Sequence, residues 1–185
     1  MGSEPDWVTE LMEERRKRED RAAKRAMRRR QSNEQLWIAL AGDHLPEMLT
    51  SQQETEKYLQ HDSWKLRLAA ISILRTLWGA SPEMAKTCGK MAFDDPNVQV
   101  RAAALFILAC CYSGTNDPSL GNRLRRIVLD ETLPHTFRRA AYSGLFQLRG
   151  TRARLIPMPG TYRFPEDVDW GFVESFNQGA KGKEQ

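Results

Sequence analysis

Cysteine is scarce in this chain: Cys88, Cys110 and Cys111 are the three examples among 185 residues, and they show no C-x-x-C spacing. This argues against a disulfide framework and against a zinc site, and it favours a reducing, cytoplasmic location. Long apolar runs are missing as well, since the run at residues 102–112 reaches only eleven residues, well short of the roughly 20 that span a bilayer. The N-terminal stretch MGSEPDW lacks the charged and apolar regions of a signal peptide. We therefore expect one soluble domain with tails and no membrane partner.

Recognisable catalytic motifs are also missing. The sequence has no G-x-S-x-G, no Walker loop and no dinucleotide fingerprint. Its histidines, His44, His61 and His135, fall in separate predicted loops without the spacing of metal ligands. We therefore expect no catalytic residues, no metal and no cofactor.

Positive charge is present but unevenly distributed. The net charge is +4, whereas residues 14–30 contain ten Lys and Arg against three acids, a balance of +7, so the rest of the chain sums to −3. The basic character therefore belongs to one segment.

A repeat with a period near 36 residues runs through the middle of the chain. The blocks LRLAAISIL (66–74), VRAAALFIL (100–108) and FRRAAYSGL (137–145) align on an arginine, two alanines and a closing leucine. Prolines and glycines recur at the same intervals, namely Pro46, Pro82 and Pro118, and Gly42, Gly79, Gly114 and Gly150. Proline is tolerated at the start of a helix and glycine supplies the left-handed residue just after it.

This punctuation predicts an all-α fold in which each unit is a pair of antiparallel helices, A and B. We expect helix A at about 46–60, 82–93 and 118–130, and helix B at about 64–78, 97–113 and 136–149. Helix B carries an apolar stripe with a 3.6-residue period. Cys111 takes a stripe position that is leucine in both other copies, so we expect a packed core thiol, whereas Cys110 is expected to be partly exposed. The stripes are Leu66, Ala70, Ile73, Leu74 and Leu77; Val100, Ala104, Ile107, Leu108 and Cys111; and Phe137, Ala141, Gly144, Leu145 and Leu148.

Residues 43–150 resemble HEAT-like repeats, particularly the short bacterial kind named after phycobilisome lyases, and DDPNVQVRAAALFIL is the best match. The resemblance implies an α-solenoid, in which stacked helix pairs contact their neighbours. It also implies that an acid in each A–B turn pairs with the arginine of helix B. We interpret these pairs as polar contacts that hold the turns, in preference to a ladder of arginines that grips a polyanion. The candidate pairs are Asp62 with Arg67, Asp95 with Arg101, and Asp130 or Glu131 with Arg138.

The N-terminal part divides into a charged arm, residues 1–31, and a half repeat at 32–42 that starts at the capping-box residues Ser32 and Gln35. The arm is either a solvated projecting helix or a basic interface for nucleic acid. Its candidate nucleic-acid contacts are Arg15, Arg16, Arg18, Arg21, Lys24, Arg25, Arg28, Arg29 and Arg30.

The C-terminal extension, residues 151–185, follows the end of the period. PEDVDWGFVESF (165–176) predicts a short helix beginning at Pro165. We expect this segment to cap the last repeat, with docking elsewhere as the alternative, and we expect the end of the chain to be disordered.

The function expected from this organisation is a non-catalytic adaptor or scaffold that binds a protein partner on the concave face of its B helices. The candidate contacts are Lys65, Leu68, Arg75, Phe106, Arg139 and Phe146. The alternative is that residues 165–176 fold back and cover this face. A nucleic-acid-binding protein is the second interpretation. A third is an enzyme, because Asp62, Trp64 and Arg67 resemble the Asp, Trp and Arg set of HEAT-like alkylpurine DNA glycosylases, although the later repeats have no matching tryptophan.

Overall fold

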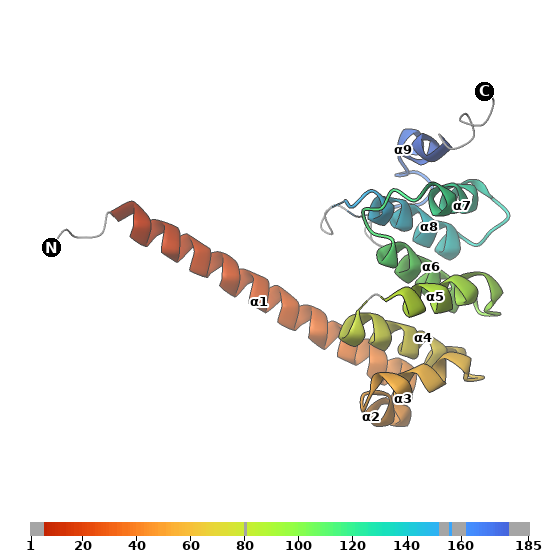
Figure 1. Ribbon diagram of the computed structural model, residues 1–185, viewed down its shortest axis with the longest axis horizontal. Coiled ribbons are helices and arrows are strands. Elements are labelled where there is room, and N and C mark those ends of the chain that lie inside the picture. The colour runs from red at the N-terminus through yellow and green to blue at the C-terminus, as the bar shows by residue number, and fades with distance from the viewer. Residues whose placement is uncertain (1–5, 80, 152–155, 157–161, 178–185) are drawn as a thin grey trace. The chain divides into compact units, whose positions relative to one another are not determined.

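The computed structural model describes residues 6–79, 81–151, 156 and 162–177, and in the first helix it describes the side chains of 13–21, 24, 27 and 31–41. All regular structure in these residues is helical, which confirms the predicted all-α class. None of the described helices is both long enough and apolar enough to cross a membrane. The chain divides into two compact units, Met1–Leu45 and Pro46–Gln185, and Figure 1 labels their helices.

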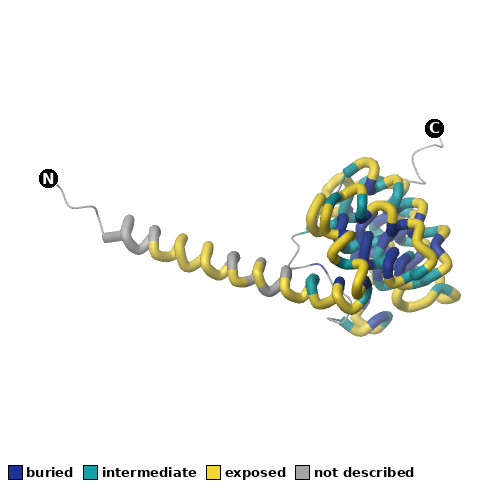
Figure 2. The backbone as a smooth tube through the Cα atoms, turned by 90° about the horizontal axis from the view of Figure 1, so that it is seen from below, coloured by how far each residue is buried: buried dark blue, intermediate teal, exposed yellow. Residues whose placement is uncertain are grey.

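The first unit consists of one long helix, α1 (Asp6–Ala41), followed by a 3-10 turn, η1 (Gly42–His44). The predicted helix start at Ser32 is wrong, because α1 runs through this residue without interruption. Residues 6–41 contain no glycine and no proline, so the capping-box pattern has no helix break to act on. The described side chains of residues 13–21 are all exposed, and Figure 2 colours this part of the backbone as exposed.

The second unit contains the predicted helix pairs, and its elements follow in this order: α2 (Leu45–Met48), α3 (Gln52–Lys57), η2 (Tyr58–Gln60), α4 (Trp64–Ile73), η3 (Leu74–Trp78), α5 (Pro82–Asp94), α6 (Val98–Cys111), α7 (Pro118–Leu129), α8 (His135–Leu148), α9 (Trp170–Glu174) and η5 (Ser175–Asn177). Helix α4 packs against η2, α5 against α6, and α7 against α8, while α6 also contacts α4 and α8. The first helix A is split, because Ser51 starts a new helix by accepting a hydrogen bond from the N–H of Glu54.

The residues that delimit the helices act as the sequence predicts. Pro82 and Pro118 begin α5 and α7, where Ser81 and Asp117 provide side-chain caps. The four periodic glycines, Gly42, Gly79, Gly114 and Gly150, all have positive φ angles, between 52° and 79°. This is the left-handed region, in which glycine carries no Cβ penalty.

The residues of the predicted apolar stripes are buried, with two exceptions at the end of helix B. Leu77 is 48% exposed, so its assignment to the core is wrong. Residues 74–78 form a π-helical turn, and its wider winding shifts the last side chains away from the 3.6-residue stripe. Cys111 is half-buried, so it is more enclosed than the aligned Leu77 and less enclosed than the aligned Leu148.

Gly144 allows α8 to approach its neighbours closely. A Cβ atom at this position would lie 3.0 Å from the Cβ of Ala109 on α6 and 3.2 Å from Cδ1 of Leu124 on α7. An alanine at this position would therefore need Ala109 and Leu124 to shift by a few tenths of an ångström.

Candidate partner-binding site

The helix-B arginines hold the turns, but their partners differ from the predicted ones. Arg67 donates to both carboxylate oxygens of Asp95, with Nε–Oδ2 at 2.7 Å and Nη2–Oδ1 at 2.9 Å. Its Nη1 donates to the backbone carbonyls of His61 and Asp62, at 2.7 and 2.8 Å. The predicted pairing with the Asp62 carboxylate is therefore wrong. Arg67 instead joins the turn of its own unit to the turn of the next unit.

The other two arginines bind backbone oxygens. Nη1 of Arg101 donates to the carbonyl of Asp95 at 2.9 Å, and Nε of Arg138 donates to the carbonyl of Val128 at 3.0 Å. The carboxylate of Asp130 instead accepts hydrogen bonds from Thr132. The predicted carboxylate pairs are wrong here as well, because the backbone oxygens at the end of helix A lie within the reach of a guanidinium.

Four of the six predicted partner-binding residues lie on α4, η3 and α6. Lys65 is exposed, while Leu68, Arg75 and Phe106 are half-buried. We call these four residues the α4–α6 surface. Two other positions of the predicted face, Ala102 and Ala109, are buried, because α6 has α4, α5 and α8 as neighbours.

The other two predicted contacts, Arg139 and Phe146 on α8, are covered by the chain's own C-terminal segment. The ring of Phe146 lies 4.2 Å from that of Phe172, measured between centroids. The hydroxyl of Tyr162 donates to the carbonyl of Arg139 at 3.3 Å, and burial raises the pKa of this phenol. At these two positions the alternative prediction, in which the segment folds back, is the one that holds.

The same segment continues onto α7. Phe176 packs on Gly121, where a Cβ atom would lie 2.7 Å from the ring. Glu174 accepts a hydrogen bond from Nη2 of Arg125 at 2.6 Å, and the guanidinium of Arg149 lies 4.5 Å from the centroid of Phe176. Residues 170–177 thus cover the last helix pair, as the cap prediction requires.

The start of the C-terminal helix differs from its prediction. Helix α9 begins at Trp170, and Asp169 caps it by accepting a hydrogen bond from the N–H of Phe172. Pro165 belongs to a preceding turn. An aspartate four residues on provides the side-chain acceptor that proline lacks. The predicted disordered end, residues 178–185, lies outside the described residues.

The candidate nucleic-acid contacts lie on α1. Arg15, Arg16, Arg18, Arg21 and Lys24 are exposed, and within this stretch Arg15 pairs with Glu19 and Arg18 with Glu14. Such i,i+4 pairs are typical of a solvated helix surface. The side chains of Arg25, Arg28, Arg29 and Arg30 lie outside the described residues.

Of the three residues that resemble a glycosylase site, Arg67 has a structural role. Arg67 is held by the Asp95 carboxylate and two carbonyls, whereas the Asp62 side chain is exposed and Trp64 is half-buried. Among the described residues there is no group of three His, Cys, Asp or Glu side chains that could hold a metal.

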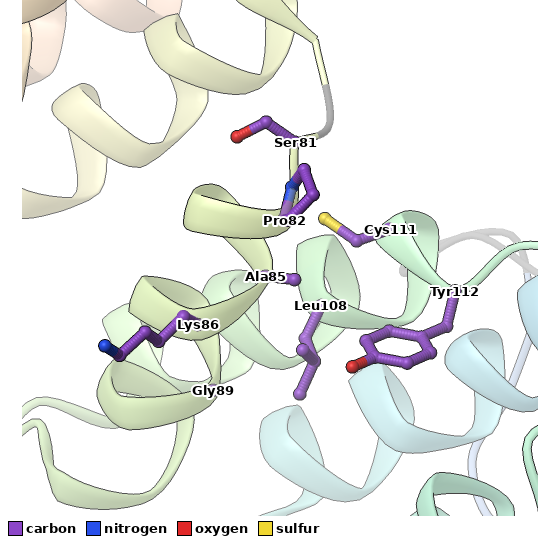
Figure 3. A pocket seen from close by; sticks show the side chains of 8 residues that line it. All are labelled: Ser81, Pro82, Ala85, Lys86, Gly89, Leu108, Cys111 and Tyr112. Carbon is purple, nitrogen blue, oxygen red and sulfur yellow. The ribbon is translucent and has the colours of Figure 1, made fainter.

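The structure has a pocket of about 600 Å³ between α5 and α6 that the sequence did not predict. Figure 3 shows its lining: Ser81, Pro82, Ala85, Lys86, Gly89, Leu108, Cys111 and Tyr112. Burial raises the pKa of Cys111 and raises that of nearby Cys88 to about 12, so both thiols are protonated at neutral pH. The signal that could have indicated the pocket is the small residues Ala85 and Gly89 one turn apart on α5.

No protein-family model matches this chain, and no curated protein or solved structure matches it either. The similarity of residues 43–150 to HEAT-like repeats therefore stays a prediction based on the aligned residues.

Proposed function

We propose that this chain is a non-catalytic adaptor, built as a HEAT-like α-solenoid, that binds a protein partner through the α4–α6 surface. The packing of α6 between α4 and α8 supports this proposal, because successive B helices that pack on one another form the extended surface on which such repeats bind partners.

One observation carries the proposal, and it comes from the chain itself. On α8, Arg139 occupies the position of Leu68 and Ala102 in the earlier repeats, and Phe146 occupies the position of Arg75 and Ala109. There the segment 162–176 lies on the helix, with Phe172 against Phe146 and the guanidinium of Arg139 5.4 Å from the ring centroid of Tyr162. An arginine and an aromatic ring on a B helix thus already engage a peptide-like segment.

The α4–α6 surface offers the same chemistry. Lys65, Arg75 and Phe106 supply two cations and an aromatic ring, and no acidic residue stands among the four members of the surface. Aromatic residues and arginine are enriched in interface hot spots. We therefore expect a partner segment that carries aromatic and acidic side chains.

The nucleic-acid interpretation stays a prediction for α1. The described part of its basic stretch pairs internally with Glu14 and Glu19, which reduces the charge that is free to bind phosphate. No described contact favours it over the protein-binding role.

The test is capture of a partner from cells of the source organism by the full chain, followed by binding measurements with the purified partner. The variant Arg75→Glu with Phe106→Ala should abolish binding and leave the melting temperature nearly unchanged. The control Gln99→Ala changes an exposed residue on the same helix, α6, and should bind like the parent. Equal binding by all three proteins would overturn the proposal.

A further inference from the structure

The pocket between α5 and α6 lies in the second repeat, and its lining residues can be aligned with residues of the third repeat. It is lined on α5 by Ala85 and Gly89 and at the end of α6 by Tyr112. With the repeats aligned on Pro82 and Pro118, Ala85 corresponds to Gly121 and Gly89 to Arg125, and alignment of the closing leucines makes Tyr112 correspond to Arg149.

Each of these third-repeat residues contacts the C-terminal segment. Gly121 lies beneath Phe176. Arg125 binds the carboxylate of Glu174, with Nε–Oε2 at 3.0 Å and Nη2–Oε2 at 2.6 Å. Arg149 lies over the Phe176 ring and donates to Oγ of Ser175 at 3.1 Å. The third repeat thus uses these positions to hold a short segment with an aromatic residue and an acid.

The second repeat has a pocket at the corresponding positions. One difference opens it, because Gly89 stands where the third repeat has the long side chain of Arg125, while Ala85 in place of Gly121 is still small. A Cβ atom built at Gly89 would meet nothing within 4 Å. In Figure 3 the side chains of Ala85, Leu108 and Tyr112 border this space, and Cys111 lies near Pro82.

We propose that this pocket binds a peptide segment of a partner protein in which an aromatic side chain enters between Ala85, Leu108 and Tyr112 and a neighbouring carboxylate pairs with Lys86. This inference rests on the proposed adaptor function and adds a second contact, made by residues that the α4–α6 surface does not include.

Charge and chemistry agree with this occupant. Lys86 and Lys90 are both exposed on α5, one turn apart, and they supply the cations that Arg125 supplies in the third repeat. Leu108 and the protonated thiol of Cys111 provide an apolar wall, against which an aromatic ring loses contact with water.

The probe is a fluorescent peptide with the sequence VDWGFVESFN, residues 168–177 of this chain, titrated into the full-length protein. We expect saturable binding that is weakened about tenfold or more by Phe→Ala at the last aromatic position of the peptide, as for a hot-spot side chain. Lys86→Glu in the protein should weaken binding, and Lys86→Arg should preserve it.

The pocket itself is tested by a matched pair of variants at one position. Gly89→Leu fills the pocket, whereas Gly89→Ala adds the same helix propensity with little volume. We expect Gly89→Leu to abolish peptide binding and Gly89→Ala to leave it intact. Equal binding by both variants would mean that the peptide displaces the chain's own segment on α7, and this outcome would overturn the proposal.

A second readout locates the peptide directly. In a Cys110→Ser background, Cys111 is the remaining partly exposed thiol, since Cys88 is fully buried. Bound peptide should slow the reaction of Cys111 with a maleimide, and unchanged reactivity at saturation would contradict the assignment.

Two further outcomes would overturn the proposal. The first is that the peptide does not bind at any accessible concentration. The second is that the full chain forms a dimer that Gly89→Leu dissociates, because the pocket would then be occupied by a second copy of this chain. The Arg75→Glu, Phe106→Ala variant separates this inference from the proposed adaptor function, because it changes no residue that lines the pocket: loss of partner binding with peptide binding retained would be specific to the α4–α6 surface.

Discussion

The guanidinium of Arg67 grips the carboxylate of Asp95 at two points, Nε–Oδ2 at 2.7 Å and Nη2–Oδ1 at 2.9 Å, although the two residues belong to different repeats. Both side chains are almost fully buried. The backbone N–H of Asn97 also donates to Asp95 at 2.8 Å, so the carboxylate is well satisfied. The contact ties the turn before α4 to the turn between α5 and α6.

Removing one member of this pair should be costly. Asp95→Ala leaves the Arg67 charge buried with only two carbonyl partners, and we expect a loss of about 3–5 kcal/mol in the free energy of unfolding. Urea denaturation followed by circular dichroism measures this value. The double variant Arg67→Leu, Asp95→Leu removes both charges and should be clearly less destabilised than the single variant. A double variant that is worse than the sum of its parts would contradict a coupled pair.

The pair also predicts a dependence of stability on pH. Burial raises the pKa of Asp95, but the hydrogen bonds from Arg67 and Asn97 outweigh this, and the net effect holds the pKa below its ordinary value. A lowered folded-state pKa stabilises the protein above the unfolded-state pKa of about 3.9, and this stability is lost as the pH falls further through the folded-state value. Thermal melts between pH 7 and pH 2 should show this loss in the parent. The Arg67→Leu, Asp95→Leu variant should show a smaller one.

Gly121 and Gly89 should respond to alanine in opposite directions. Gly121→Ala forces a Cβ to within 2.7 Å of the Phe176 ring, so we expect displacement of the C-terminal segment and a loss of about 1–3 kcal/mol. Gly89→Ala meets no atom and should be neutral or stabilising by up to about 1 kcal/mol. Melting temperatures and limited proteolysis near residue 165 give the comparison. Equal proteolysis of the two variants would contradict the docked position of Phe176.

The π-helical turn gives a prediction about two leucines three residues apart. Leu74 is 1% exposed and Leu77 is 48% exposed. Leu74→Ala should therefore cost about 2–5 kcal/mol, whereas Leu77→Ala should cost much less. Similar losses measured by urea denaturation would mean that the regular helical stripe, and not the π-helical turn, describes this end of helix B.

Truncation tests the role of α1. A chain without residues 1–30 keeps the buried Trp37 and Ala41, so its unfolding should stay cooperative. If the basic stretch binds nucleic acid, the full chain should retard duplex DNA at low salt, with a steep loss as salt rises, and the truncated chain should not. Absence of retardation in both chains would remove the nucleic-acid interpretation.

The sequence predicts the helices and their ends well, because these depend on local chemistry. Proline and capping side chains begin α5 and α7, and the glycines with positive φ follow the B helices. Contacts between repeats are harder to predict. The resemblance to HEAT-like repeats implies Asp62 as the partner of Arg67, but the carboxylate that Arg67 binds belongs to the next turn.

The binding face was predicted less well for a related reason. An exposed face opposite the core stripe is expected when a helix has neighbours on one side only. Helix α6 has neighbours on several sides, which buries Ala102 and Ala109, and α8 is covered by a segment whose position the repeat period does not determine. The sequence did not predict the pocket at Gly89, because the pocket depends on the absence of a side chain at this position.

The covering of α8 has a consequence for how copies of this chain associate. Arg139, Tyr142 and Phe146 align with Ala102, Leu105 and Ala109 of α6, which are buried, and Ala109 lies against Gly144 of the following helix. On α8 the segment that follows Tyr162 stands where a further helix would otherwise pack. A chain that lacked this segment would offer a vacant apolar helix face, and a contact between unlike surfaces of successive copies does not close on itself but grows into a filament. If the chain is the proposed α-solenoid, we therefore expect the docked segment to oppose end-to-end polymerisation of its copies.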